Sequence, residues 1–392
     1  MRTTLRRLAL LLFPILVATF VLAQPSPRVP VIAGNYVVNV LVEVDGTVKT
    51  WGNPYSGSQN PSLGDGIKPS PNSAIKTPQT LAGVSDIVDA SVGRTQVLLL
   101  KRDGSVLAWG DNVECEVGSR ETKSMYSPVP VAGLRGVKQV VASEFISGAV
   151  LADGSVWLWG SGKAGQLANG LSGWQTPCAK VPTRIEGVSG VKRLSIDRDS
   201  VIALKDDGTV WGWGKNDGGQ LCNGTTDKVP QPVQLKGLSQ VVDLVVDGSS
   251  YFVLADGSVR MCGHGADGIL NPDPTAENAN HFTPFRVPGI ATARTVNSDR
   301  ETIIVHLGDG TLMGFGSGYH GSLGDGHGDR PLSKPHPPIG VGPVLAHYTS
   351  RGASYAIRKD GTVLAWGIPA PPGGKTSFIL TPTVVFTVKL AE

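Results

Sequence analysis

The apolar and polar positions of this chain follow a short pattern that recurs along its length. A few apolar residues lead to an Asp-Gly pair, and an apolar-rich stretch such as Ser105 to Gly110 follows. This pattern predicts two β-strands joined by a two-residue hairpin turn, in which Asp-Gly supplies the positive φ angles. No long stretch has helical periodicity. The pattern therefore indicates an all-β protein.

Seven such units cover the chain, and their Asp-Gly pairs lie 49 to 58 residues apart. The pairs are Asp45-Gly46, Asp103-Gly104, Asp153-Gly154, Asp207-Gly208, Asp256-Gly257, Asp309-Gly310 and Asp360-Gly361. In six units an aromatic residue before a glycine stands six residues after the Asp: Trp51, Trp109, Trp159, Trp213, Phe315 and Trp366. Cys262 holds this position in the fifth unit. Repeats of this length are typical of solenoids, propellers or arrays.

The remainder of each unit decides among these architectures. Most units continue with a proline-valine stretch such as Ser127 to Val131, a turn at Gly133 and a further strand over Gly136 to Val141. Four strands a unit predict a seven-bladed β-propeller with four-stranded antiparallel blades. Large residues such as Trp109 alternate with small ones such as Ala108, so the large face of one blade can pack on the small face of another. The repeated tryptophans are thus interpreted as core.

The two ends of the chain predict how the ring closes. Pro30 to Gly34 match the last strand of a unit, and Thr381 to Phe386 match the proline-valine strand. We expect the N- and C-terminal strands to pair within one shared blade, because this leaves no open sheet edge.

The first 23 residues are typical of a secretory signal peptide, because Arg2, Arg6 and Arg7 precede an apolar run from Leu8 to Leu22. That run is shorter than the roughly 20 residues needed to span a bilayer. We expect a secreted or periplasmic mature protein that begins at about Gln24, forms one propeller domain over residues 24–392 and has no membrane span.

The net charge of the chain indicates whether a nucleic acid is a suitable partner. The chain has 35 basic and 32 acidic side chains, and residues 1–23 contain three of the arginines and no acid, so the mature chain is formally neutral. Proteins that bind DNA or RNA usually carry a basic excess. We therefore expect no nucleic-acid partner.

The fullest units resemble the repeat of the regulator of chromosome condensation family. They run from Leu204 to Gly224, with Gly219-Gln220-Leu221, and from Leu151 to Gly170, with Gly165-Gln166-Leu167. The resemblance implies a seven-bladed propeller that binds other proteins, since members include an exchange factor, ubiquitin-ligase modules and a secreted bacterial inhibitor of β-lactamases. Export and neutral charge argue against the nuclear roles.

Few residues suggest chemistry. The four cysteines fit no metal motif and permit three pairings. Cys115 and Cys178 lie in loops of adjacent blades and are our predicted disulfide, whereas Cys262 is expected to be a buried thiol. There is no Gly-x-Ser-x-Gly elbow, and the repeated aspartates are equivalent turn residues. We predict no catalytic residue, no metal, no cofactor and no enzymatic activity.

The most variable segments are the loops between each Trp-Gly and the following proline, which a propeller places on one face. Loops of this kind usually carry recognition. We expect a monomer that binds an unidentified protein partner through this face. The candidate contact residues are Tyr55, Tyr126, Trp174, His281, Phe282, Tyr319 and His320.

Two alternatives stay open. One is an inhibitor of a secreted enzyme, like the propeller that blocks β-lactamases. The other is an enzyme whose site lies at the central channel, which would require histidines and acids from different blades to converge at one mouth.

Overall fold

The computed structural model describes residues 29–35, 37–55, 62–264, 281–299, 302–328, 331–350, 352–368 and 378–391. The predicted signal peptide, residues 1–23, lies outside these ranges. No helix among the described residues is long and apolar enough to cross a membrane.

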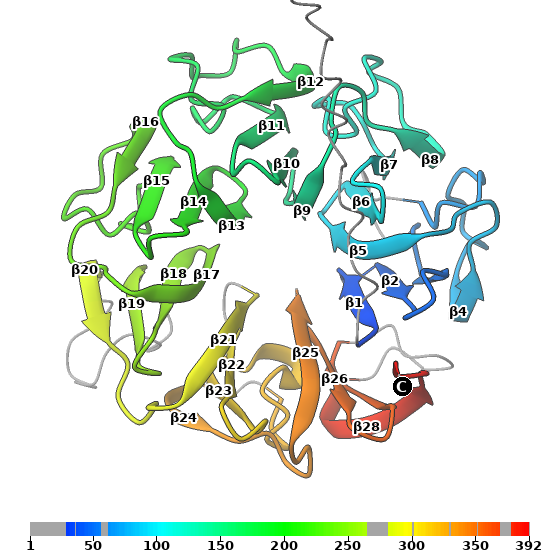
Figure 1. Cartoon of the computed structure of the whole chain (residues 1–392). Coiled ribbons are helices and arrows are strands. Elements are labelled where there is room, and N and C mark those ends of the chain that lie inside the picture. Colours follow the sequence, from blue (N-terminus) through cyan, green and yellow to red (C-terminus); the bar gives the residue numbers. More distant parts are fainter. Residues whose placement is uncertain are drawn as a thin grey trace, which may run out of the picture.

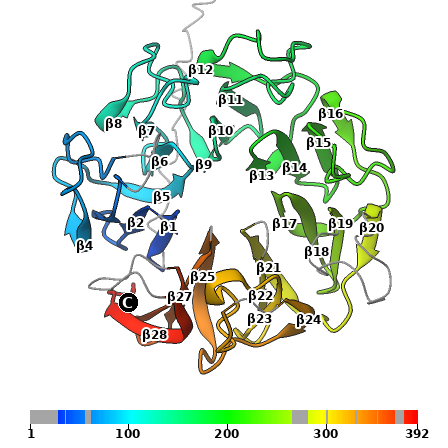
Figure 2. The same ribbon diagram turned by 180° about the vertical axis from the view of Figure 1, so that it is seen from behind.

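Seven four-stranded antiparallel sheets stand in a ring (Figures 1 and 2), which confirms the predicted fold class and blade number. Blades 1 to 4 consist of β1 (Val31–Gly34), β2 (Val38–Val42), β3 (Val48–Gly52), β4 (Ile75–Thr80); β5 (Ile87–Val92), β6 (Gln96–Lys101), β7 (Val106–Gly110), β8 (Met125–Pro130); β9 (Val137–Ala142), β10 (Ile146–Leu151), β11 (Val156–Gly160), β12 (Ala179–Arg184); and β13 (Val191–Asp197), β14 (Ser200–Lys205), β15 (Val210–Gly214), β16 (Val229–Gln234). Blades 5 to 7 consist of β17 (Val241–Asp247), β18 (Ser249–Leu254), β19 (Val259–Gly263), β20 (His281–Arg286); β21 (Ala293–Ser298), β22 (Thr302–Leu307), β23 (Leu312–Gly316), β24 (Leu332–His336); and β25 (Val344–Ser350), β26 (Ala353–Arg358), β27 (Thr362–Gly367), β28 (Ile379–Thr387). A short 3₁₀ helix, η2 (Tyr319–Gly321), follows β23.

The predicted closure by pairing of the terminal strands is wrong. β1 pairs with β2 in blade 1, and β28 pairs with β27 in blade 7, so each blade is continuous in sequence. β1 is an innermost strand and β28, which contains Pro382, an outermost one (Figure 1), so they cannot share an edge. Side chains close the ring instead: Trp51 packs edge-on against Tyr355 and Phe386, and the Tyr348 hydroxyl donates to the Gly34 carbonyl at 2.8 Å.

The Asp-Gly turns also differ from expectation. In the first, the amide of Gly46 donates to the Glu43 carbonyl and that of Glu43 donates to the Thr47 carbonyl, both at 2.9 Å, which makes a three-residue loop. Only the glycine has positive φ, at 85°, and the Asp45 carboxylate accepts from the Thr47 amide. The hydrogen bond from the Thr47 amide lowers the pKa of Asp45. In the six equivalent turns, hydrogen bonds from the Ser or Thr two residues later lower the pKa of the aspartate in the same way. The repeated aspartates therefore stabilise turns.

Four of the repeated tryptophans hydrogen-bond to the loop of the blade before their own. All five are fully buried, and Phe315 is 1% exposed. The indole Nε1 of Trp159 donates to the Glu116 carbonyl at 2.9 Å, and Trp109, Trp213 and Trp366 make the same bond to the preceding blade. A Cβ on Gly118 would lie 2.8 Å from that Nε1. A small residue in one blade is thus required by the tryptophan of the next.

The fifth blade replaces this contact with a disulfide, so Cys262 is not the buried thiol that we expected. Cys222, at the repeat position of Gly118, bonds to Cys262, at the position of the tryptophan, with Cα atoms 5.6 Å apart. The bridge fills the site at which the indole packs elsewhere, since the Cys262 Sγ lies 3.8 Å from the Gln220 carbonyl.

Candidate functional site

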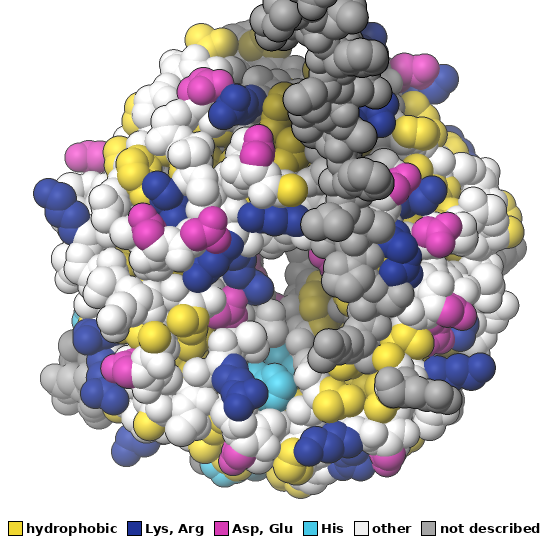
Figure 3. Space-filling view, in the orientation of Figure 1, with side chains coloured by type: hydrophobic (Ala, Val, Ile, Leu, Met, Phe, Trp, Pro, Cys, Tyr) yellow, Lys and Arg dark blue, Asp and Glu magenta, His cyan; other side chains and the backbone are white. Residues whose placement is uncertain are grey.

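The innermost strands of the blades are β1, β5, β9, β13, β17, β21 and β25, and residues of all of them except β1 line a central cavity of about 900 Å³. Figure 3 shows its opening, with basic and acidic side chains gathered at the edge. A cavity of this size falls in the range of ligand-binding and active sites.

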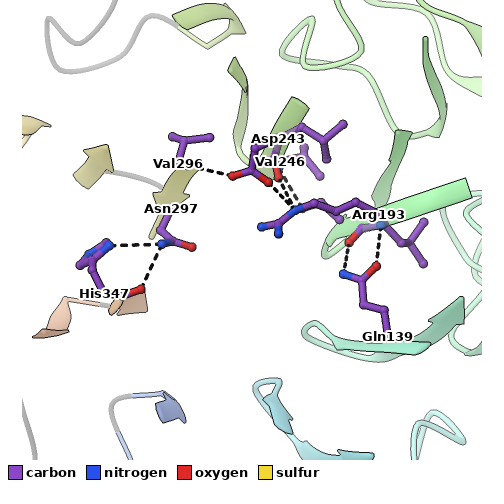
Figure 4. Close-up of polar contacts among 10 residues, drawn as sticks. Gln139, Arg193, Asp243, Val246, Val296, Asn297 and His347 are labelled. Atoms are coloured by element: carbon purple, nitrogen blue, oxygen red, sulfur yellow. Dashed lines mark hydrogen bonds and ion pairs between the residues drawn. The ribbon is translucent and has the colours of Figure 1, made fainter. Parts of the chain in front are cut away.

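Many polar side chains along the cavity bind the backbone of the next blade (Figure 4). The Gln139 side chain accepts from the Leu194 amide at 2.8 Å and donates to the Leu194 carbonyl at 3.0 Å. The Asn297 side chain donates to the His347 carbonyl at 3.3 Å. Ser91 and Ser195 accept in the same way from the amides of Ala142 and Val246. These side chains therefore stabilise the ring.

The shortest ion pair in this wall joins blades 4 and 5. The Arg193 Nε lies 2.7 Å from Asp243 Oδ1 and also donates to the Leu244 carbonyl at 3.3 Å. Asp243 accepts in addition from the Val296 amide of blade 6 at 3.0 Å. Burial raises the pKa of Asp243, and Arg193 opposes this shift. The pair links three blades.

The channel mouth on the side of the long loops has a second ionic cluster. Glu144 is 4% exposed and lies 3.1 Å from Arg198 Nε and 3.8 Å from Arg94 Nη1. Asp197 and Asp299 accept from the amides of Gly248 and Gly352 in the following blades. Here too the acidic groups connect neighbouring blades.

Three titratable groups that the sequence pattern did not single out have shifted pKa values. Burial lowers the pKa of His347 to about 3, which keeps its imidazole neutral. Burial raises the pKa of Asp89 on β5 to about 6 and that of Glu116 to about 7. An alignment of the repeats could have pointed to two of these groups. Asp89 occupies the position of Gln139, Arg193 and Asp243 in other blades, and Glu116 occupies the position of Gln166 and Gln220.

The predicted contact residues do not form one cluster. Tyr55 is 50% exposed in the blade 1 loop, and Trp174 is 87% exposed in the blade 3 loop. Tyr319 and His320 belong to η2 and line the channel mouth, where the His320 ring lies 4.4 Å from that of Phe378. The sequence pattern alone does not distinguish a residue in an exposed outer loop from one at the channel mouth.

The other three candidates lie on outer strands and not in the loops. Tyr126 is on β8 and is partly buried. His281 and Phe282 are on β20, and the His281 ring lies 4.2 Å from that of Phe285. Phe282 packs close to Gly219 of blade 4, and the Gly224 amide of the same blade donates to the Phe282 carbonyl at 2.8 Å. Phe282 thus packs partly on an adjacent blade.

A disulfide joins the loops of blades 2 and 3. Cys115 and Cys178, the pair proposed from the sequence, are bonded, with Cα atoms 5.8 Å apart. None of the described cysteines is free. The described residues contain no group of three or more His, Cys, Asp or Glu side chains that could hold a metal ion.

Comparison with known proteins identifies the repeat. The model of the regulator of chromosome condensation (RCC1) repeat matches residues 153–197 and 207–255. The human E3 ubiquitin-protein ligase HERC2 is 28% identical over 280 residues, which are 67% of this chain and 6% of HERC2. The mitochondrial RCC1 domain-containing protein RUG3 of Arabidopsis thaliana is 27% identical over 54% of this chain and 48% of its own length. The chain thus spans less than half the length of both relatives.

Solved structures share the fold at low identity. Prp20p of Saccharomyces cerevisiae superposes with a TM-score of 0.74 and 18% identity, over 88% of this chain and 87% of its own. Human WBSCR16 gives a TM-score of 0.70 and 22% identity, over 86% and 89%. The chain is therefore a seven-bladed β-propeller that contains RCC1 repeats over residues 153–197 and 207–255 and shares the fold of these solved propellers.

Proposed function

We propose that this protein is an exported, non-enzymatic, monomeric propeller that binds a protein partner through its long-loop face. One contrast carries the proposal. The polar side chains of the channel wall bond to neighbouring blades, whereas the long loops leave large apolar side chains in water, above all Trp174 at 87% exposure. Exposed aromatic residues on a rigid scaffold are typical of protein interfaces.

Related propellers support a protein partner. Prp20p is described with its binding to Gsp1p and histones, and yeast RCC1 (Prp20) with Kap60 bound to it. Several relatives are ubiquitin-protein ligases, but the match covers 6% of HERC2, so ligase activity is not part of the proposal. The formally neutral mature chain favours a protein over a nucleic acid.

Export is supported by residues 1–23 and by the two disulfides, which persist in oxidising compartments. We expect the protein recovered from the medium or periplasm of its native organism to begin at about Gln24, as N-terminal sequencing would show. Recovery from the cytoplasm with Met1 or Arg2 at its N-terminus would contradict export.

The binding face is tested by placing a photo-crosslinking amino acid at single positions. Tyr55 and Leu171 report on the long-loop face, and Ala152 and Asp206, exposed in Asp-Gly turns, are controls on the opposite face. After irradiation in the native organism we expect one protein adduct from the first pair and none from the second, read by gel shift and mass spectrometry. Adducts from the control positions only, or from no position, would refute the proposal.

A further inference from the structure

Trp174 has the greatest exposure of the large apolar side chains in the described chain. It lies between β11 and β12 of blade 3 and is 87% exposed, whereas the five repeat tryptophans are completely buried. Burying a side chain of this size contributes about 2 to 3 kcal/mol. In the isolated molecule Trp174 lacks this stabilisation, and contact with a partner would supply it.

The loop that carries Trp174 makes several contacts. The Lys163 Nζ lies 5.5 Å from the centre of the indole ring and 2.5 Å from Glu114 Oε1 of blade 2. The Gly173 amide donates to the Lys163 carbonyl at 2.7 Å, and the loop is bonded to blade 2 through Cys178. These contacts restrict the loop, and a restricted loop loses less conformational entropy on binding.

Two further apolar side chains of these loops are exposed. Val113, next to Glu114, is 58% exposed, and Leu171, three residues before Trp174, is 53% exposed. We call Val113, Leu171 and Trp174 the Trp174 patch. An exposed tryptophan is typical of the energetic centre of a protein interface, and Val113 and Leu171 add exposed apolar area in the same loops.

The charges beside the patch are predominantly basic. Arg120, Lys180 and Lys228 are exposed and form no ion pair with a described residue, whereas the acids Glu114 and Glu121 are paired with Lys163 and Lys123. The Arg120 amide donates to the Lys180 carbonyl, and the Lys228 side chain lies against Gly165 in the Trp174 loop. Asp227 is the one exposed acid of the blade 2 to 4 loops without an ion pair to a described residue.

We propose that the Trp174 patch binds an acidic protein segment that carries an apolar side chain. Trp174 would cover the apolar side chain, and Arg120, Lys180 and Lys228 would attract the carboxylates around it. Complementary charge of this kind raises the association rate and selects the partner. The inference rests on the proposed function and names the chemistry of its partner.

The test uses a phage-displayed library of random dodecapeptides, panned on the purified protein with counter-selection on Trp174→Ala. We expect the selected peptides to be acidic and to contain an aromatic or aliphatic residue. Their affinity, measured by fluorescence anisotropy, should fall about 30-fold in Trp174→Ala. It should fall about tenfold when Arg120, Lys180 and Lys228 are all changed to Glu, and it should weaken with added salt.

Val242→Ala is the control, since it removes an exposed apolar side chain beside the Asp256-Gly257 turn, away from the long loops, and should leave the affinity unchanged. The melting temperature of each variant shows whether it is folded. The inference is overturned if no peptide is selected, if selected peptides are neutral or basic, or if Trp174→Ala binds them equally. Binding of phosphatidylglycerol vesicles without peptide selection would also overturn it. Crosslinks from Tyr55 and Leu171 that persist in Trp174→Ala would refute this inference alone and leave the proposed function intact.

Discussion

Replacing Cys262 with tryptophan should lower the free energy of unfolding by about 4 kcal/mol, even though it restores the residue of the other blades. The substitution removes a disulfide that closes a 40-residue loop, which contributes about 4 kcal/mol by loop-closure entropy. It also places an indole against the side chain of Cys222. The thermal or urea unfolding transition of the purified variant measures the loss.

Changing Cys222 to Gly in addition should recover a large part of the lost stability. At the equivalent positions Gly64, Gly118 and Gly324, a Cβ would lie 2.8 to 3.0 Å from the tryptophan of the next blade. Ala168 holds the equivalent position before Trp213 and packs against the hydrophobic cluster that contains this tryptophan, so a methyl group is tolerated there, but Cys222 adds a sulfur atom. Cys222→Ala with Cys262→Ala is the control for loss of the bridge alone. If the single variant Cys262→Trp were as stable as the double variant that also carries Cys222→Gly, the two positions would not be coupled.

Changing Glu116 to Gln should stabilise the protein at pH 8 and have little effect at pH 4. Burial raises the pKa of Glu116 from 4.5 to about 7, so the folded state binds more protons than the unfolded state between these values. Stability therefore falls as the pH rises from about 4.5 to about 7 and stays low above that. The shift in pKa corresponds to a loss of about 3 kcal/mol in the free energy of unfolding above neutral pH. Glutamine removes this penalty because it has no proton to lose.

The repeat supplies the matched control for this prediction. The Glu116 carboxylate accepts from the Glu114 amide at 2.8 Å, just as the Gln166 side chain accepts from the Ala164 amide at 2.9 Å. Gln166→Glu should therefore create a similar loss of stability above neutral pH in blade 3. Urea unfolding of the three proteins at about pH 4 and about pH 8, on either side of the shifted pKa, measures both effects. Equal stability of Glu116→Gln and the natural protein at the higher pH would contradict the assignment.

The sequence predicted the blades because their signals are local. An Asp-Gly turn and a tryptophan six residues later lie within one hairpin, and their recurrence indicates the number of units without any knowledge of tertiary contacts. The sequence predicted a two-residue turn, whereas the loop has three residues, because Asp45 adopts negative φ and its side chain accepts a hydrogen bond from the Thr47 amide. Composition and spacing do not distinguish these two turn types.

The sequence analysis placed the first strand of each blade at the end of the preceding unit, whereas in the structure it pairs with the hairpin that follows it. The strand over Val137 to Ala142 lies between a proline-valine strand and a hairpin, and its sequence fits pairing with both. Proline cannot donate to a ladder, which places strands such as β8 at the outer edge and sends the chain to the inner edge of the next blade. For this reason the ring closes through Trp51, Tyr348 and Tyr355 instead of through shared strands.

By itself, the sequence determined the repeat, the all-β fold and the place of the variable loops, since each depends on residues close together in the chain. Only the tertiary structure decided that Cys222 bonds Cys262, that Arg193 pairs with Asp243, and that Trp174 is exposed while five tryptophans are buried. The two bonded pairs join residues of adjacent blades that are far apart in the chain. Which side chains meet there depends on the twist and spacing of the blades, which no local pattern specifies.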